Sequence, residues 1–251
     1  MGFTYKGEWN IPFKFGFTKL GEYKINLHVF EENHPEIELN LLFSDHLRSH
    51  PESVSEYAKI KEQLLLEEGS FKKQEGHLFT GYNLGKDAFI RRILEKEGYA
   101  RHRFLKETHI KEWESYHRIR KEQIFDRTHV VYDPNHPTIH AKGNFHFILC
   151  LGMNVVTVAH VEFLNEFEVA LRSLATDEPY KKQGLGKTMM ELLEKWIKHQ
   201  GKKVIRLHAA SQAEGFYRKL GYFDMPFDDP SIAKETIDLG KILPDFLKTK
   251  Q

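Results

Sequence analysis

Hydrophobic and polar residues follow two different patterns along the chain, and the change falls near residue 100. The first pattern predicts one strand and then three helices, at about 22–30, 35–48, 51–65 and 86–97. Pro35 and Pro51 each suit the first position of a helix, and Gly98 suits the position just after one. The Gly- and Lys-rich stretch 67–85 is predicted to be a loop.

After residue 100 the pattern alternates between strands and helices. Strands are predicted at 101–106, 138–142, 144–152, 154–164, 166–176, 203–209, near 222 and at 236–239, and helices at 108–125, 186–198 and 212–220. Thr108 can cap the first of these helices, and Gly221 can end the last. The chain is therefore expected to be α/β (α+β), with two domains over 1–99 and 100–251.

The composition argues against some classes of partner but does not identify a function. The 251 residues are 40% hydrophobic and 29% charged, which is enough apolar material for a packed core. Lys+Arg 37 and Asp+Glu 36 leave a net charge of +1, so no nucleic acid or membrane partner is expected. The single cysteine, Cys150, lies in an apolar run and is expected to be a buried strand residue. With no signal-like start and no bilayer-length apolar run, a cytoplasmic protein is expected.

A loop rich in glycine and lysine separates the predicted strand 166–176 from the helix that follows it. The loop contains, in order, Lys181, Lys182, Gln183, Gly184, Leu185, Gly186 and Lys187. The start of a helix offers backbone N–H groups and a positive dipole end, and glycine lets an anion approach them. Lys181 stands where a Walker A motif needs glycine, which argues against a P-loop NTPase. The loop predicts an anion site, although a tight strand-to-helix turn would have the same signature.

A second motif follows about thirty residues further on. The run Gln212-Ala213-Glu214-Gly215-Phe216-Tyr217-Arg218-Lys219-Leu220-Gly221-Tyr222 resembles the second signature of the GNAT N-acetyltransferases, and the loop at 181–186 resembles the first. Residues 172–176 are similar to the fourth strand of that family, whose end splays from the fifth. The resemblance covers about residues 101–251.

The GNAT resemblance implies a mixed, mostly antiparallel central sheet with flanking helices, and acetyl-CoA as the co-substrate. It implies that the loop at 181–187 holds the pyrophosphate. It also implies further cofactor contacts from Leu174, Ala175, Thr176 and Phe216. Lys181 replaces the family's usual Arg or Gln and loses planar hydrogen bonding. Ala210 replaces an asparagine that many relatives place near the cofactor.

In the GNAT mechanism an amine attacks acetyl-CoA directly in a ternary complex. Tyr217 occupies the family's general-acid position, although it could instead pack against the cofactor or the core. Glu168 is the candidate general base. It shares a strand face with residue 170, where some family members carry a catalytic glutamate. Glu162 and Glu166 are alternatives that could instead bind a cationic acceptor. Deprotonation through water would need no single side chain.

No metal site is expected, although the chain has 15 histidines. Pro137 separates His136 from His140 and breaks any helix that would align them. His46 and His50 bracket the end of a predicted helix. No Cys/His cluster has the spacing of a zinc site.

Three runs in the first hundred residues, 7–12, 25–38 and 42–52, resemble the C-terminal half of GrpB-family (UPF0157-like) proteins. These are nucleotidyltransferase-fold units, and some precede a GNAT domain. The family's chemistry needs a Gly-Ser followed by paired aspartates, whereas Asp45 and Asp87 lie on different predicted helices here. We interpret residues 1–99 as a truncated module. His28 is expected to be a half-buried strand residue, and the alternative is that it lines a residual pocket. A half-domain exposes sheet edges, which predicts a homodimer or docking onto the second domain.

Three functions remain in order of preference. The first is an N-acetyltransferase that transfers acetyl from acetyl-CoA to a primary amine of a small molecule or protein. The alternative is a non-catalytic regulatory module that binds acetyl-CoA or CoA. A nucleotidyltransferase is disfavoured because the paired aspartates are missing.

Overall fold

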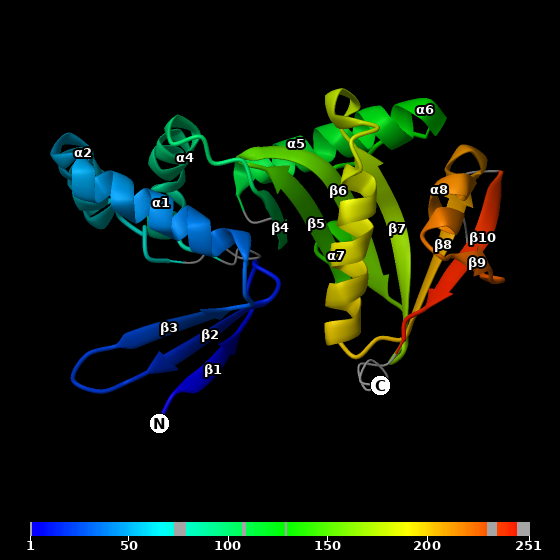
Figure 1. Cartoon of the computed structure of the whole chain (residues 1–251), viewed down its shortest axis with the longest axis horizontal. Coiled ribbons are helices and arrows are strands. Elements are labelled where there is room, and N and C mark those ends of the chain that lie inside the picture. Colours follow the sequence, from blue (N-terminus) through cyan, green and yellow to red (C-terminus); the bar gives the residue numbers. More distant parts are fainter. Residues whose placement is uncertain (1, 73–78, 107–108, 129, 230–234, 245–251) are drawn as a thin grey trace. The chain divides into compact units, whose positions relative to one another are not determined.

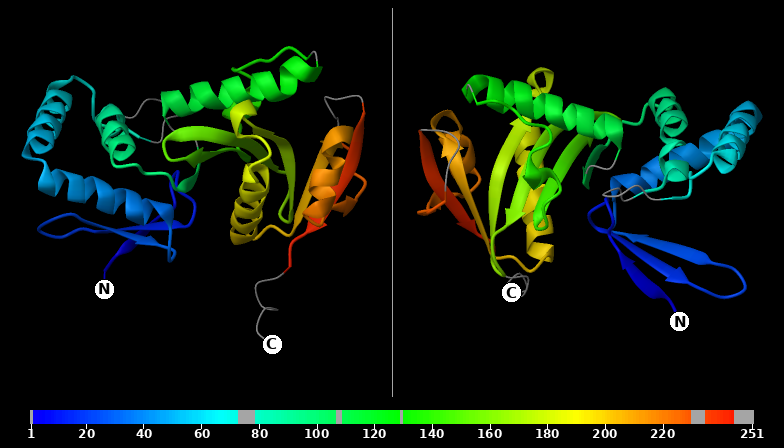
Figure 2. Two further views of the ribbon diagram at one scale, coloured as in Figure 1. Left: turned by 45° about the horizontal axis from the view of Figure 1, so that its top comes forward. Right: turned by 180° about the vertical axis from the view of Figure 1, so that it is seen from behind.

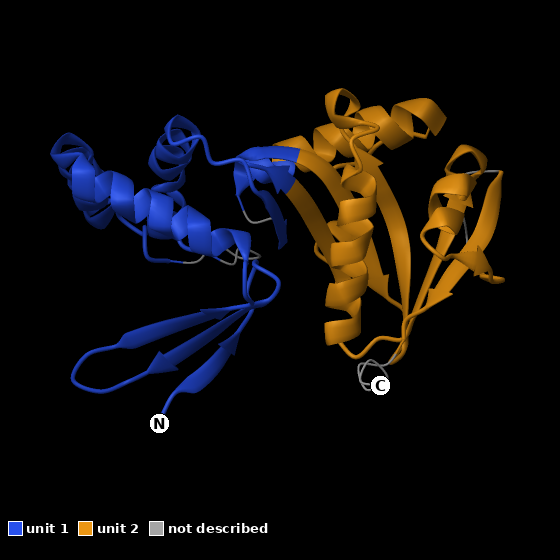
Figure 3. Ribbon diagram, viewed as in Figure 1, with its two compact units in different colours: residues 1–113, 150–155 blue, residues 114–149, 156–251 orange. Residues whose placement is uncertain are grey.

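The computed structural model of the chain describes residues 2–72, 79–106, 109–128, 130–229 and 235–244. The chain forms two compact units, one made of 1–113 with 150–155 and the other of 114–149 with 156–251 (Figure 3). The domain boundary expected at about residue 100 stays a prediction. No helix in the described ranges has the length and apolar character needed to cross a membrane.

The first unit begins with a three-stranded antiparallel sheet in the order β1-β2-β3, followed by helices (Figure 1). Its elements are β1 (Thr4–Gly7), β2 (Lys14–Lys19), β3 (Ile25–Phe30), α1 (Pro35–Ser49), α2 (Pro51–Leu66), α3 (Gly81–Leu84) and α4 (Asp87–Lys96). The three helices predicted for this stretch are confirmed, and α1 and α2 each begin at their proline. The sequence pattern missed β1 and β2 and the single turn of α3, which lies within the predicted loop.

The helices of the first unit enclose a small core. Leu39, Leu94, Tyr99 and Met153 are buried together, and Leu42, Phe43 and Ile90 pack against them. The Arg103 guanidinium donates to the Glu36 carboxylate at 2.5 Å, and both side chains are nearly buried. A buried charge pair is tolerated only when both charges are satisfied, so removal of either partner would leave a costly unpaired charge.

The sheet of the first unit leaves apolar side chains uncovered. Strand β3 lies at the edge, and Ile25, Leu27 and Val29 are exposed by 50%, 43% and 42%. Exposed apolar edge strands favour pairing with another surface. These exposed residues match the expectation for a half-domain, and the homodimer inferred from it stays a prediction.

A seven-stranded sheet has the order β4-β5-β6-β7-β8-β10-β9 (Figure 1). Its strands are β4 (His102–Lys106), β5 (Asn144–Leu151), β6 (Asn154–Phe163), β7 (Glu168–Thr176), β8 (Val204–Ala210), β9 (Phe223–Asp224) and β10 (Thr236–Ile242). The pairs β6–β7, β8–β10 and β9–β10 are antiparallel, whereas β7–β8 is parallel. The predicted fold class, a mixed and mostly antiparallel sheet with flanking helices, is confirmed.

Helices lie on both faces of this sheet. Helix α7 (Leu185–His199) crosses one face, and α5 (Ile110–Arg120) crosses the other, which is seen from behind in Figure 2. A π-helical turn (Lys121–Phe125) and α6 (Asp126–Thr128) continue α5, and α8 (Glu214–Lys219) follows β8 through a 3₁₀ turn (Ser211–Ala213). The predicted cap Thr108 lies outside the described residues.

The strand predicted at 138–142 is wrong. Residues 137–139 form a 3₁₀ turn instead, because Pro137 fixes its own backbone and has no N–H for a ladder. The His136 side chain accepts a hydrogen bond from the Thr138 N–H at the start of this turn. Alternation of Ile139 with polar neighbours therefore reflects one buried side chain, not a strand.

The core of the second unit is built on Trp196 of α7. Its ring packs against three phenylalanines of β5 and β6, with centroids 4.7 Å from Phe147, 5.1 Å from Phe145 and 5.7 Å from Phe163. Trp196 and Phe147 are fully buried. This aromatic cluster fixes α7 against the strands, and so fixes the position of the loop that precedes α7.

Two buried histidines stack on the α5 side of the sheet, with ring centroids 4.4 Å apart. His146 receives a hydrogen bond from the Tyr116 hydroxyl (2.6 Å) and donates one to the Thr138 carbonyl (3.1 Å). His160 donates to Asn144 Oδ1 at 2.6 Å. Burial lowers the pKa of His146 to about 4 and that of His160 to about 2, so both rings are neutral at pH 7.

We predict that the second unit loses stability as the pH falls from 7 to 4. Both pKa values lie below the unfolded value of 6.5, so the unfolded chain binds more protons in this window. The expected loss is on the order of 1–3 kcal/mol per histidine, measured by urea unfolding with Trp196 fluorescence. His160→Asn keeps a polar side chain without this proton uptake and should show a shallower slope. Equal slopes for the variant and the wild type would contradict the prediction.

Candidate functional site

The parallel strands β7 and β8 separate after a short paired stretch. Glu168, Val169 and Ala170 pair with Val204, Ile205 and Arg206, and the two strands diverge beyond these positions (Figure 1). In contrast, β7 pairs with β6 up to Thr176, and β8 pairs with β10 along its whole length. The result is a wedge, defined as the gap between residues 171–176 of β7 and residues 207–210 of β8. Beyond Ala170 and Arg206, the facing edges of β7 and β8 are not paired with each other.

The loop after β7 ends at an uncapped helix start. Gly184 precedes α7 with φ +81°, and no side chain makes a capping hydrogen bond there. No acidic residue lies in the first turn. Lys182 also has a left-handed backbone, with φ +63°, an uncommon conformation for a residue with a side chain. The α7 N-terminus therefore presents its dipole and backbone N–H groups without a competing carboxylate.

Three segments that are distant in sequence meet beside this helix start. A Cβ atom built on Gly186 would lie 3.5 Å from the Phe216 ring and 3.7 Å from Thr176 Oγ1. Thr176 Oγ1 is itself 3.1 Å from the Thr157 hydroxyl, which fixes the end of β7. The predicted cofactor residues at the end of β7, at the start of α7 and on α8 thus lie together.

The charged side chains of the loop mostly contact other protein groups. Lys181 Nζ donates to Gln123 Oε1 and to Glu178 Oε2, both at 2.7 Å. Lys187 is exposed, and its Nζ lies 3.7 Å from Glu191. Lys181 therefore joins the loop to the π-helical turn, a role that its position in the motif did not indicate.

An arginine that the sequence reasoning missed anchors the other side of the loop. Arg118 of α5 donates to both carboxylate oxygens of Asp177, at 3.1 and 2.6 Å. Asp177 follows β7 directly and caps the 3₁₀ turn at Glu178–Tyr180. The Arg118 guanidinium holds the pKa of Asp177 below its usual range. No local motif marks this pair, because its members are far apart in the sequence.

Tyr217 lies on α8 and is buried, with 8% of its surface exposed. Its ring packs between Phe216 and Tyr222, with centroids 5.0 and 5.6 Å away. Burial raises the pKa of the Tyr217 phenol well above its usual range, so the hydroxyl keeps its proton at neutral pH. A protonated phenol can donate, which is the property that a general acid needs.

Glu168 lies where β7 and β8 still pair. Its Oε1 accepts from Arg206 Nη2 at 2.7 Å, and its Oε2 accepts from Asn165 at 3.0 Å. These hydrogen bonds, the one from Arg206 first, lower the pKa of Glu168 below its usual range. A carboxylate with a lowered pKa is a weak proton acceptor, and the assignment of Glu168 as the base stays a prediction.

The other two carboxylates considered as bases have different surroundings. Glu162 accepts from Arg172 Nε at 2.6 Å, and the same guanidinium also donates to Asp229. Glu166 is exposed in the turn between β6 and β7. Ala170 is fully buried and pairs with both Glu162 and Arg206 across its two neighbouring strands.

A histidine on β8 was also missed by the sequence reasoning. His208 Nδ1 lies 2.8 Å from the Asp238 carboxylate of β10. Its Nε2 is buried and has no hydrogen-bond partner among the described residues. The pair arises from the β8–β10 register, in which His208 lies opposite Asp238. A local sequence pattern does not reveal that register.

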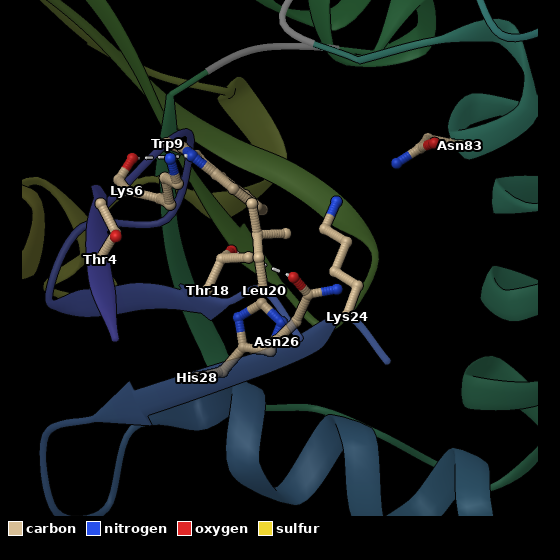
Figure 4. A pocket seen from close by; sticks show the side chains of 9 residues that line it. All are labelled: Thr4, Lys6, Trp9, Thr18, Leu20, Lys24, Asn26, His28 and Asn83. Carbon is tan, nitrogen blue, oxygen red and sulfur yellow. Dashed lines mark hydrogen bonds between the residues drawn. The ribbon is translucent and has the colours of Figure 1, made fainter. Parts of the chain in front are cut away.

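The first unit has a separate hollow of about 570 Å³ on one face of its sheet. Lys6, Trp9, Lys24 and His28 line it together with Thr18 and Asn26, which are joined by a hydrogen bond (Figure 4). His28 is exposed and lines this hollow, so the expectation of a half-buried strand histidine is wrong.

The described parts of both units bear on the possible metal ligands and on the single cysteine. Within those parts, no group of three or more His, Cys, Asp or Glu residues could hold a metal ion. Cys150 is a free and buried cysteine, as the apolar run around it indicated. Burial raises the pKa of its thiol to about 12, so the thiol keeps its proton at neutral pH.

Comparison with known proteins divides the chain in two. Residues 1–96 match the GrpB protein family, and residues 102–222 match the acetyltransferase (GNAT) family. UPF0157 protein YqkA of Bacillus subtilis (strain 168) is 37% identical over 91 residues, 36% of this chain and only 24% of that protein's length. A second Bacillus subtilis protein, named as an acetyltransferase, is 38% identical over 115 residues, 45% of this chain and 70% of its own length.

The fold has a counterpart among solved structures. A Lactobacillus plantarum protein whose crystal structure is described as an N-acetyltransferase superposes with a TM-score of 0.50 at 14% identity. The match covers 57% of this chain and 99% of that one, and it concerns the fold alone. Together with the two sequence matches, these findings show that the chain belongs to the GNAT acetyltransferase family and carries a GrpB-related segment ahead of its acetyltransferase domain.

Proposed function

We propose that the chain transfers the acetyl group of acetyl-CoA to a primary amine of an unidentified small molecule or protein. The amine would attack the thioester directly, in a complex that holds both substrates. The observation that carries the proposal is the wedge between β7 and β8, which opens beside the uncapped start of α7. An extended molecule with a pyrophosphate at one end suits that combination.

The residues around the wedge fit acetyl-CoA. Gly184 and Gly186 leave room at the α7 N-terminus, where the pyrophosphate would accept from backbone N–H groups. The β7 edge at Leu174, Ala175 and Thr176 would pair with the amide-bearing pantetheine arm. Lys182, Gln183, Leu185 and Lys187 complete the proposed loop, with Lys181 fixing its shape and Phe216 packing beside it.

Tyr217 is the proposed general acid. Its buried phenol would give a proton to the departing thiolate of CoA, which avoids releasing a charged sulfur into an apolar setting. Acetyl-CoA supplies the activated acyl group, and the chain's own residues bind it, orient it and move protons. Glu168 remains a candidate base within this proposal.

Two other functions make different predictions for the same assay. A CoA-binding regulatory module would bind acetyl-CoA but release no free thiol with any member of an amine panel. A nucleotidyltransferase would need metal held by paired carboxylates. In the described chain, Asp45 instead bonds Arg48 and Asp87 bonds Arg91.

Gly184→Ala tests the proposed pyrophosphate loop. A side chain at φ +81° is strained, and it would crowd the phosphates, so we expect roughly tenfold weaker CoA binding by calorimetry, about 1.4 kcal/mol. Gly201→Ala is the matched control, because Gly201 has φ +77°, equally open space and a position at the other end of α7. Both variants should lose about 1 kcal/mol of folding stability. Equal CoA affinity in the two variants would count against the loop.

Tyr217→Phe tests the proposed acid. It keeps the packing against Phe216 and Tyr222 but removes the proton, so kcat should fall on the order of 100-fold while the KM for acetyl-CoA changes little. The measurement is thiol release with a saturating amine. Tyr222→Phe removes a neighbouring buried hydroxyl and should keep most of the activity. An unchanged kcat in Tyr217→Phe would eliminate the acid role.

A further inference from the structure

His208 is a half-buried histidine on the β8 side of the wedge. The last β7–β8 pair joins Ala170 to Arg206, and His208 lies two residues further along β8. Phe163 of β6 packs on Trp196 of α7, so the next residue, Glu162, points to the opposite face. Its cross-strand partner Ala170 pairs in turn with Arg206, which places Arg206 and His208 on that face as well. His208 therefore borders the wedge on the face away from α7.

The hydrogen bond with Asp238 sets the tautomer of the ring. A carboxylate can only accept, so Nδ1 of His208 carries the proton at this 2.8 Å contact. Asp238 is fixed in turn, because its Oδ2 accepts from the Phe227 N–H at 3.1 Å. The Phe227 ring stacks on the imidazole with centroids 4.8 Å apart. The lone pair thus lies on Nε2, the atom that is buried and has no partner among the described residues.

We propose that His208 Nε2 accepts a proton from the acceptor's ammonium group, with Asp238 as the residue that positions the imidazole. The proposal rests on the acetyl transfer proposed above and identifies the acceptor as an amine that arrives as its cation. A histidine oriented by a carboxylate is the arrangement that general bases require.

The proton and bond changes balance without a further reactant. The ammonium loses one proton to His208 Nε2, and the neutral nitrogen then attacks the thioester carbonyl. The C–N bond forms and the C–S bond breaks. Tyr217 protonates the sulfur, and the second proton lost by nitrogen restores the phenol through solvent. The products are an amide, CoA thiol and the imidazolium, which returns its proton to water.

The charges around His208 suit a cationic acceptor. Asp238 of β10 and Asp229 face the ring, the latter 4.0 Å from Nε2, and they would stabilise the imidazolium. Arg172 of β7 is the cation on this side, and it is bound to Glu162 and Asp229. Arg206, the other nearby cation, is bound to Glu168. His208 and Glu168 differ as candidate bases. The lone pair on His208 Nε2 has no partner among the described residues, whereas both carboxylate oxygens of Glu168 accept hydrogen bonds.

The test compares thiol release by the full chain and three variants with two acceptors. One acceptor is an alkylamine that is protonated at neutral pH, and the other is trifluoroethylamine, which is largely neutral there. His208→Gln should lower kcat/KM for the alkylamine on the order of 100-fold and leave trifluoroethylamine nearly unaffected. Glu168→Gln should show no such difference between the amines. His199→Gln, an exposed histidine at the far end of α7, is the control and should match the wild type.

The positioning role of Asp238 is tested by a measurement that a purely structural role would leave unchanged. Asp238→Asn should shift the pH dependence of kcat/KM and Asp238→Glu should partly restore it, with CoA affinity and thermal unfolding checked in each variant. An alkylamine kcat/KM in His208→Gln equal to that of the wild type would overturn the His208 assignment and leave acetyl transfer standing. An equal loss with both amines would also overturn it. No thiol release by the wild type with any amine would overturn acetyl transfer and the His208 role together.

Discussion

The divergence of β7 from β8 is the constraint on which the rest of the second unit depends. Three residue pairs hold the strands together, and beyond Ala170 and Arg206 each strand is held only from its outer side, by β6 and by β10. The outer ladders keep both strands regular, so the inner edges can separate without losing the sheet. Those edges carry backbone donors and acceptors, with which the amide-bearing arm of the proposed acetyl-CoA would pair.

The other parts of the site lie on the rim of this wedge. Arg118 holds Asp177 where β7 ends, and the Trp196 cluster fixes α7 so that its uncapped start lies beside Thr176 and Phe216. Two groups suited to proton transfer lie on different elements. A buried phenol that keeps its proton lies on α8, and a histidine whose Nε2 has no partner among the described residues lies on β8.

Local features of the sequence predicted the parts of the fold that local chemistry controls. Pro35 and Pro51 begin helices because they cannot lie inside them, and Gly184 marks a left-handed turn that other residues adopt at a cost. The same reasoning failed at 138–142, where Pro137 overrode an apparent alternation. The Lys181 ammonium bonds Gln123 and Glu178, which the motif did not indicate, and its contact with the cofactor stays a prediction. His208 with Asp238 depends on strand register, which periodicity alone does not contain. The acceptor side of the site was therefore the least predictable part.

In the proposed complex, CoA occupies the wedge and the adjoining start of α7. Amide hydrogen exchange, followed by mass spectrometry with and without CoA, tests this binding mode most directly. We expect slower exchange on CoA binding at Leu174–Thr176 and Gly184–Lys187, with little change in β1, β2 and β3. CoA binding that leaves exchange at 174–176 and 184–187 unchanged, or that protects only the strands of the first unit, would contradict it.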